Sequence, residues 1–99
     1  EDLREVIANV DVVYMLRTWR ENGSLVYDLT DNFVLNAATA KLAKPNAIFM
    51  HPLPIDSRVQ EIKPEVEKDP RSVFLNEQVK AGLYIRMALL YIVMKNKLS

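Results

Sequence analysis

The first sixteen residues predict a helix followed by a strand. Leu3, Val6, Ile7 and Val10 fall at positions i, i+3, i+4 and i+7, which places them on one face of a short amphipathic helix. Residues 12–16 are apolar without interruption and include β-branched and aromatic side chains, a pattern typical of a strand buried on both faces. A helix followed by a buried strand is the rhythm of an α/β protein with a parallel sheet.

A second helix and a second buried strand are predicted between residues 36 and 50. Asn36 is suited to be the N-cap of a helix over residues 37–43, and Pro45 ends that helix. Residues 47–50 form a short apolar run, and His51-Pro52-Leu53-Pro54 breaks the chain at its carboxyl end. Two prolines at alternate positions remove backbone donors and stiffen the loop, and one of the X-Pro bonds is a candidate for the cis form.

The last third of the chain predicts a short helix, a third strand and a long helix. Pro64 suits the first turn of the short helix, residues 72–75 suit a strand, and residues 77–97 suit the long helix. Eight apolar side chains leave the long helix little polar face: Leu83, Ile85, Met87, Leu89, Leu90, Ile92, Val93 and Met94. A helix apolar nearly all round must be covered by other structure. We therefore expect a parallel-sheet α/β protein with a long apolar C-terminal helix that packs on a further domain or subunit.

Composition excludes several classes of function. The 13 basic and 13 acidic residues cancel, so a basic stripe for nucleic acid is not expected. The chain has no cysteine, one histidine (His51) and two glycines, which argues against thiolate metal sites, catalytic zinc and a Gly-rich phosphate loop. The longest apolar stretch, residues 87–94, is far short of the ~20 residues that cross a bilayer. We expect a cytoplasmic location, no metal and no membrane partner, and a chain cut from within a longer protein because its first residues open a helical pattern directly.

Two segments lie where open α/β sheets bind ligands, at the carboxyl ends of the predicted strands. Residues 17–22 contribute Arg17, Arg20 and Trp19, a candidate to stack on a ligand, and residues 51–58 contribute His51, Arg58 and the carbonyls of the proline loop. Planar guanidinium groups suit a carboxylate ligand, and a stiff loop holds carbonyls ready for a small amide or amine. The alternative is that the arginines form solvated surface ion pairs, that His51 is a hydrogen-bonded structural residue and that Trp19 packs on its neighbours.

Five segments in order resemble the aspartate carbamoyltransferases. They are Asp11-Val12-Val13-Tyr14-Met15-Leu16-Arg17, Met50-His51-Pro52-Leu53-Pro54, Arg58-Val59-Gln60-Glu61-Ile62, Asp69-Pro70-Arg71 and Gly82-Leu83-Tyr84-Ile85-Arg86-Met87-Ala88-Leu89-Leu90. Their spacing is close to that of the family across nearly all 99 residues. His-Pro-Leu-Pro also separates the chain from the ornithine enzymes, in which the loop reads His-Cys-Leu-Pro.

The resemblance implies a transferase that joins the amine of L-aspartate to the carbamoyl group of carbamoyl phosphate in pyrimidine biosynthesis, without metal or cofactor. It implies that the fold is half of a Rossmann-like parallel-sheet domain, with residues 1–76 as the second half of the aspartate-binding domain. It also implies that residues 77–99 pack back on an absent carbamoyl-phosphate domain. Complete chains of the family form homotrimers. The family's phosphate-binding Ser-Thr-Arg-Thr motif does not occur in this sequence, so we expect the 99 residues alone to be inactive.

Site residues follow from the same resemblance. The residue matching Arg17 binds the aspartate side-chain carboxylate, and the acid matching Glu21 helps to orient it. Main-chain carbonyls matching Pro52 and Leu53 receive the carbamoyl amino group. The resemblance further implies that the Leu53–Pro54 bond is cis, with His51 and Arg58 as supporting residues.

The sequence departs from the family on the aspartate side of the site. Trp19 replaces a glutamine that contacts aspartate, Asn22 replaces an arginine, and residues 55–57 are an insertion before Arg58. Two alternatives therefore stay open. One is a related carbamoyltransferase with another amino-acid acceptor, and the other is a non-catalytic interaction module that retains the fold.

Overall fold

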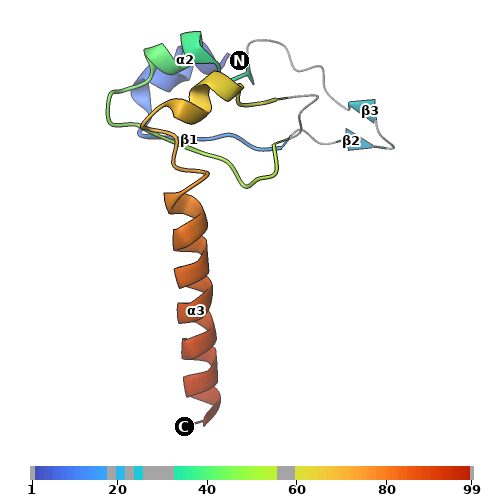
Figure 1. Ribbon diagram of the computed structural model, residues 1–99, viewed down its shortest axis with the longest axis vertical. Coiled ribbons are helices and arrows are strands. Elements are labelled where there is room, and N and C mark those ends of the chain that lie inside the picture. The colour runs from blue at the N-terminus through green and yellow to red at the C-terminus, as the bar shows by residue number, and fades with distance from the viewer. Residues whose placement is uncertain (1, 18–19, 22–23, 26–32, 56–59, 99) are drawn as a thin grey trace.

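The computed structural model describes residues 2–17, 20–21, 24–25, 33–55 and 60–98 (Figure 1). Of residues 20–21 and 24–25, it describes the backbone only. In chain order the elements are helix α1 (Leu3–Val6), 3₁₀ helix η1 (Ile7–Asn9), strands β1 (Val12–Tyr14), β2 (Arg20–Glu21) and β3 (Ser24–Leu25), helix α2 (Ala37–Leu42), strand β4 (Ile48–Met50), 3₁₀ helix η3 (Pro64–Lys68) and helix α3 (Glu77–Leu98). The predicted α/β class is confirmed by this order.

Strands β1 and β4 form a parallel pair in which Val13 lies opposite Phe49. Backbone hydrogen bonds continue the ladder at both ends, from the Ile48 N–H to the Asp11 carbonyl and from the Met15 N–H to the Met50 carbonyl, each 2.9 Å long. The carboxyl ends of both strands consequently meet at one edge of the sheet. The short strands β2 and β3 pair separately and antiparallel.

The hydrophobic core lies between this parallel pair and the helices α1, α2 and η3, which gather on one side of it (Figure 1). Phe49, Phe74, Ile7, Leu35 and Ile62 are among its largest fully buried side chains. The described core residues come from positions 7–13 and 35–74, so the core joins η1, β1, α2, β4 and η3, and none of these residues lies in β2, β3 or α3.

The prediction that the first strand is buried on both faces is wrong. Val13 is 5% exposed, but its neighbours Val12 and Tyr14 are 48% and 50% exposed. Successive side chains of a strand point to opposite faces, and within the described residues only the face of Val13 is covered by helices. An uninterrupted apolar run predicts that both faces of the strand are buried, but the face of Val12 and Tyr14 is exposed.

The predicted third strand is reduced to a single bridge. Ser72 forms a parallel bridge with Phe49, supported by hydrogen bonds from the Phe49 N–H to the Arg71 carbonyl (2.8 Å) and from the Val73 N–H to the Phe49 carbonyl (3.1 Å). The chain then turns over residues 74–76 and enters α3. Phe74 is buried in that turn.

Both ends of α2 are closed by side chains. The Asn36 Oδ1 accepts hydrogen bonds from the Ala38 and Thr39 N–H groups (2.9 and 3.0 Å), and the Asn36 N–H donates to the Thr39 Oγ1 (2.8 Å). The predicted N-cap is thereby confirmed as a reciprocal capping box. At the other end the Arg71 guanidinium donates to the carbonyls of Ala40, Ala43 and Lys44.

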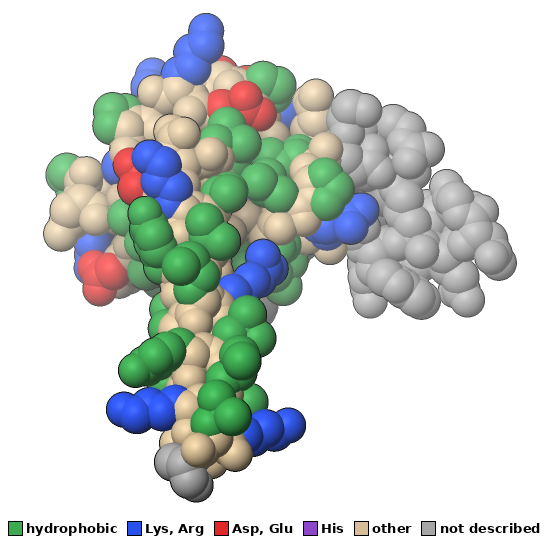
Figure 2. All heavy atoms as spheres, turned by 60° about the horizontal axis from the view of Figure 1, so that its bottom comes forward, with side chains coloured by type: hydrophobic (Ala, Val, Ile, Leu, Met, Phe, Trp, Pro, Cys, Tyr) green, Lys and Arg blue, Asp and Glu red, His purple; other side chains and the backbone are tan. Residues whose placement is uncertain are grey.

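Helix α3 projects away from the rest of the fold (Figure 1). The prediction of an apolar helix is wrong for the element as a whole, because it carries five charged residues: Glu77, Lys80, Arg86, Lys95 and Lys97. Its large hydrophobic side chains lie between and beside these charges and are exposed on the described surface, as the green spheres in Figure 2 show. Within the described residues, no helix is long and apolar enough to span a membrane.

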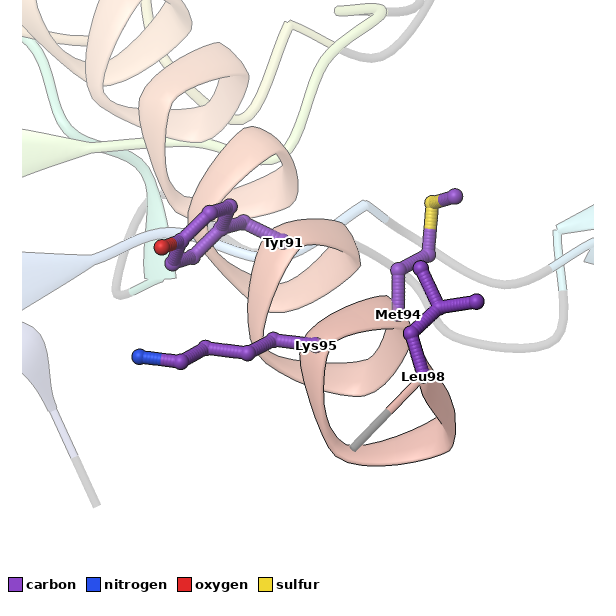
Figure 3. Close-up of a pocket in the computed structure, with 4 residues that line it drawn as sticks. All are labelled: Tyr91, Met94, Lys95 and Leu98. Atoms are coloured by element: carbon purple, nitrogen blue, oxygen red, sulfur yellow. The ribbon is translucent and has the colours of Figure 1, made fainter.

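The far end of α3 shows the mixed character of its surface. Four side chains there line a shallow hollow (Figure 3): Tyr91, Met94, Lys95 and Leu98. The Lys95 ammonium lies 5.9 Å from the centre of the Tyr91 ring, so the cation and the aromatic face attract each other weakly. Tyr91 and Lys95 extend to one side of the helix, and Met94 and Leu98 extend to the other (Figure 3).

Candidate active site at the sheet edge

The candidate site lies at the edge where β1 and β4 end. Because the strands are parallel, the segment of residues 15–17 and the loop of residues 51–55 leave the sheet from this same edge. A hollow opens beside them. Its lining comes from the strand ends and the loop (Tyr14, Met50, Pro52, Leu53) and from the first turns of α3 (Gln78, Val79, Ala81, Gly82, Ile85, Arg86).

The loop after β4 has a defined and unusual backbone. Leu53 has a φ of 53°, a left-handed conformation that is uncommon for a residue with a side chain, and the Leu53–Pro54 bond is cis as expected. The Leu53 N–H donates a 2.9 Å hydrogen bond to the Nδ1 atom of His51. A left-handed φ at a leucine persists only where the surroundings hold it, and here the His51 side chain holds the Leu53 N–H.

The His51 side chain binds the backbone of the loop. Its side chain is fully buried, and its Nδ1 accepts a hydrogen bond, so the proton of the neutral ring lies on Nε2. Burial lowers the pKa of His51; the Glu61 carboxylate opposes this shift and the Arg17 charge adds to it. A neutral, buried imidazole whose acceptor atom is already engaged fits the structural interpretation of His51 better than a catalytic one.

Glu61 is the member of this site that sequence reasoning missed. Its Oε2 lies 3.9 Å from the Nε2 of His51, and Glu61 is only 2% exposed. Three glutamates at positions 61, 65 and 67 are spaced like one polar helix face, but Glu61 does not belong to it. It precedes η3, which begins at Pro64, and is buried, whereas Glu65 and Glu67 are exposed.

Arg17 is exposed and lies three residues beyond the end of β1. It is close enough to the loop for its charge to lower the pKa of the His51 imidazole. Pro52 and Pro54 are exposed, and Leu53 is partly buried. The structure therefore brings Arg17 and residues 51–54 to one edge of the sheet.

The remaining candidates cannot be placed in the same way. Trp19 and Arg58 lie outside the described residues, as do Asn22 and most of the insertion at residues 55–57. Glu21 lies in β2, and its side chain is outside the described part of the chain. Among the described residues, no group of three or more His, Cys, Asp or Glu side chains is arranged to hold a metal ion.

Comparison with known families gives the geometry its context. Residues 1–93 match the family described as aspartate/ornithine carbamoyltransferase, Asp/Orn binding domain. The chain belongs to this family. That membership confirms the resemblance seen in the sequence.

Curated relatives are catalytic subunits of aspartate carbamoyltransferase. The chain is 43% identical to that of Bifidobacterium longum over 91 residues, which are 89% of this chain and 27% of the relative. It is 37% identical to that of Alkaliphilus oremlandii over 99 residues, which are 97% of this chain and 29% of the relative. The chain therefore spans less than a third of the length of these relatives.

Solved structures show the same fold. The aspartate transcarbamoylase of Trypanosoma cruzi in complex with carbamoyl aspartate and phosphate superposes with a TM-score of 0.74 at 31% identity, covering 89% of this chain and 27% of that one. A putative aspartate carbamoyltransferase of Leishmania major superposes with a TM-score of 0.70 at 30% identity, with the same coverage. The carbamoyltransferase fold is thus present in part.

Proposed function

We propose that residues 1–99 are the acceptor-binding portion of an aspartate carbamoyltransferase and that further polypeptide supplies the carbamoyl-phosphate domain. The observation that carries this proposal is the convergence of Arg17 and the proline loop on one edge of the parallel strands, beside a hollow. Membership of the family and the ligands named for the Trypanosoma cruzi structures, aspartate and carbamoyl phosphate, support it.

In this proposal the site works by holding two anions and fixing their orientation. Arg17 pairs with the side-chain carboxylate of L-aspartate, and the carbonyls of Pro52 and Leu53 accept hydrogen bonds from the carbamoyl amino group. The aspartate amine then forms a bond to the carbamoyl carbon, the bond from that carbon to the phosphate oxygen breaks, phosphate leaves and the amine loses a proton. The protein contributes orientation and electrostatic stabilisation to this step rather than a covalent intermediate.

The exposed hydrophobic residues of α3 support different roles for the two parts of the chain. Residues 1–76 hold the core and the loop, and residues 77–99 pack against the carbamoyl-phosphate domain, where the side chains now facing water become buried. The complete enzyme, by which we mean residues 1–99 together with that domain, is proposed to be a cytoplasmic homotrimer. The 99 residues alone are expected to form no carbamoyl aspartate above the uncatalysed rate.

The deciding experiment replaces Arg17 by alanine in the complete enzyme. Because a charge-assisted pair is lost, kcat/KM for aspartate should fall roughly 10- to 100-fold. The matched control is Lys44→Ala, which removes a cation at the opposite, amino-terminal edge of the strands, where Lys44 pairs with Asp11. Equal kinetics for both variants would overturn the proposal.

A different acceptor is the second candidate, and the observation that favours it is Trp19 in place of the family's glutamine. The same assay with L-ornithine in place of L-aspartate separates the two. If ornithine is turned over faster than aspartate, ornithine is the acceptor. The proposed contacts of Pro52 and Leu53 with the carbamoyl group would then stay unchanged.

A further inference from the structure

Gln78, in the first turn of α3, makes two hydrogen bonds to the backbone of a single residue. Its Oε1 accepts from the His51 N–H at 3.2 Å, and its Nε2 donates to the His51 carbonyl at 2.7 Å. One amide side chain therefore satisfies both backbone groups of the residue that immediately follows β4. Gln78 itself is partly buried, so water competes little for these bonds.

These two bonds extend the row of backbone hydrogen bonds along β4 beyond the point where a neighbouring segment provides backbone partners. On this side of β4 the N–H and carbonyl of Phe49 pair with Arg71 and Val73. His51 is two residues further on, so its backbone groups face the same side. By that point the chain has turned away over residues 74–76, and the Gln78 side chain takes the place of the missing strand.

The Gln78 side chain starts from a fixed backbone. The Gln78 N–H donates a 2.9 Å hydrogen bond to the carbonyl of Val73, whose own N–H pairs with Phe49. The amide thus reaches His51 from a segment already tied to β4. Its two contacts run from α3 to the residue that, through its Nδ1, holds the Leu53 N–H.

We propose that Gln78 is a positioning residue that holds the His51–Leu53 loop in the geometry needed to receive the carbamoyl group. This inference rests on the proposed function, because it concerns the same loop carbonyls, and it names a residue that acts on them through His51. The effect falls on the carbamoyl donor, since Arg17 contacts the other substrate.

The test compares Gln78→Met with the parent in the complete enzyme. Methionine keeps the length of the side chain and removes both hydrogen bonds, so KM for carbamoyl phosphate should rise about tenfold while KM for aspartate changes less than twofold. Lys41→Met is the control, because Lys41 is exposed on α2, outside the segment proposed to pack on the carbamoyl-phosphate domain, and it should leave both constants unchanged.

A second variant separates positioning from a general loss of structure. In Gln78→Glu the carboxylate accepts from the His51 N–H but donates to the His51 carbonyl only when protonated. At about pH 8 this carboxylate is ionised and lacks the donor, so KM for carbamoyl phosphate should rise about tenfold while KM for aspartate changes less than twofold. This variant remains testable where Gln78→Met fails to fold, and an unchanged KM for carbamoyl phosphate would overturn the proposal.

The two proposals fail in different ways. A loss of aspartate affinity in Arg17→Ala with unchanged carbamoyl phosphate kinetics in Gln78→Met removes the role of Gln78 and leaves the proposed function standing. Unchanged kinetics in Arg17→Ala removes the proposed function itself. An equal rise of both KM values in Gln78→Met also overturns the role, because it indicates a structural defect of the whole site.

Discussion

Arg71 and His51 both hold backbone groups through side-chain hydrogen bonds, but over different distances along the chain and in opposite electrostatic states. Arg71 binds carbonyls 27 to 31 residues away, whereas His51 binds the Leu53 N–H two residues away. The Arg71 guanidinium is charged, keeps part of its side chain exposed, pairs with Asp69 and lies 4.8 Å from the centre of the Phe49 ring. The His51 imidazole is neutral and fully buried, and its partner is the Leu53 N–H. Arg71 closes a helix in the core, whereas His51 shapes a loop beside the hollow.

The difference shows how the fold separates stability from positioning. Hydrogen bonds from the Arg71 guanidinium lower the pKa of Asp69, and Asp69 in turn raises the pKa of Arg71, so each group favours the charged form of the other. A cation at the carboxyl end of α2 also faces the negative end of that helix's dipole. These contacts lie away from the residues that line the hollow, so their loss should unfold the chain without altering the site of molecules that remain folded.

The largest expected effect comes from Arg71→Met in the complete enzyme. Removal of the hydrogen bonds to three carbonyls and to Asp69 should lower the free energy of unfolding by about 3 kcal/mol. Hydrogen exchange should accelerate first in residues 37–44, and kcat/KM per folded molecule should stay at the parental value. Lys68→Met, an exposed neighbour, serves as the control. Acceleration that begins in residues 51–55 would show that the two centres are not separate.

A smaller effect is expected at the opposite end of the same helix. Asn36→Ala removes an N-cap that accepts two backbone hydrogen bonds, which should cost about 1 kcal/mol of unfolding free energy. Asn36→Asp keeps the acceptor and should recover most of that loss. Urea denaturation at neutral pH measures the unfolding free energy of both variants. Equal stability of Asn36→Ala and the parent would show that the Asn36 cap does not stabilise the fold.

The smallest effect concerns His51 and is a dependence of the free energy of unfolding on pH. Burial holds the pKa of His51 below its ordinary value of 6.5, so the unfolded chain takes up this proton before the folded chain does. The stability that this imidazole contributes is therefore complete above pH 6.5 and declines as the pH falls from there toward the folded pKa. Asp69 contributes a similar decline only below its ordinary pKa of 3.8.

His51→Asn isolates this contribution, because asparagine offers an acceptor for the Leu53 N–H and does not titrate. We expect the unfolding free energy of the parent to fall between pH 7 and pH 5 and that of His51→Asn to fall less over the same range. Parallel curves for the two proteins would show that the buried imidazole has no part in the pH response.

The sequence by itself determined the N-cap at Asn36, the long C-terminal helix and the proline loop after β4, because each depends on neighbours within a few residues. It was less accurate for the first helix, which ends at Val6 and continues as a 3₁₀ turn, and for the third strand, which is a single bridge. The prediction that Arg17 and the loop at residues 51–54 lie at one edge of the sheet followed from the rule that ligands bind where parallel strands end.

Only the tertiary structure decided which side chains are buried and which distant groups meet. Glu61 lies 10 positions from His51, and Gln78 lies 27 positions away. No local period links these residues, because their proximity is set by packing of the whole core. The exposure of Val12, Tyr14 and the hydrophobic side chains of α3 has the same origin: hydrophobicity states a preference for burial, and the surrounding layers determine whether that preference is met.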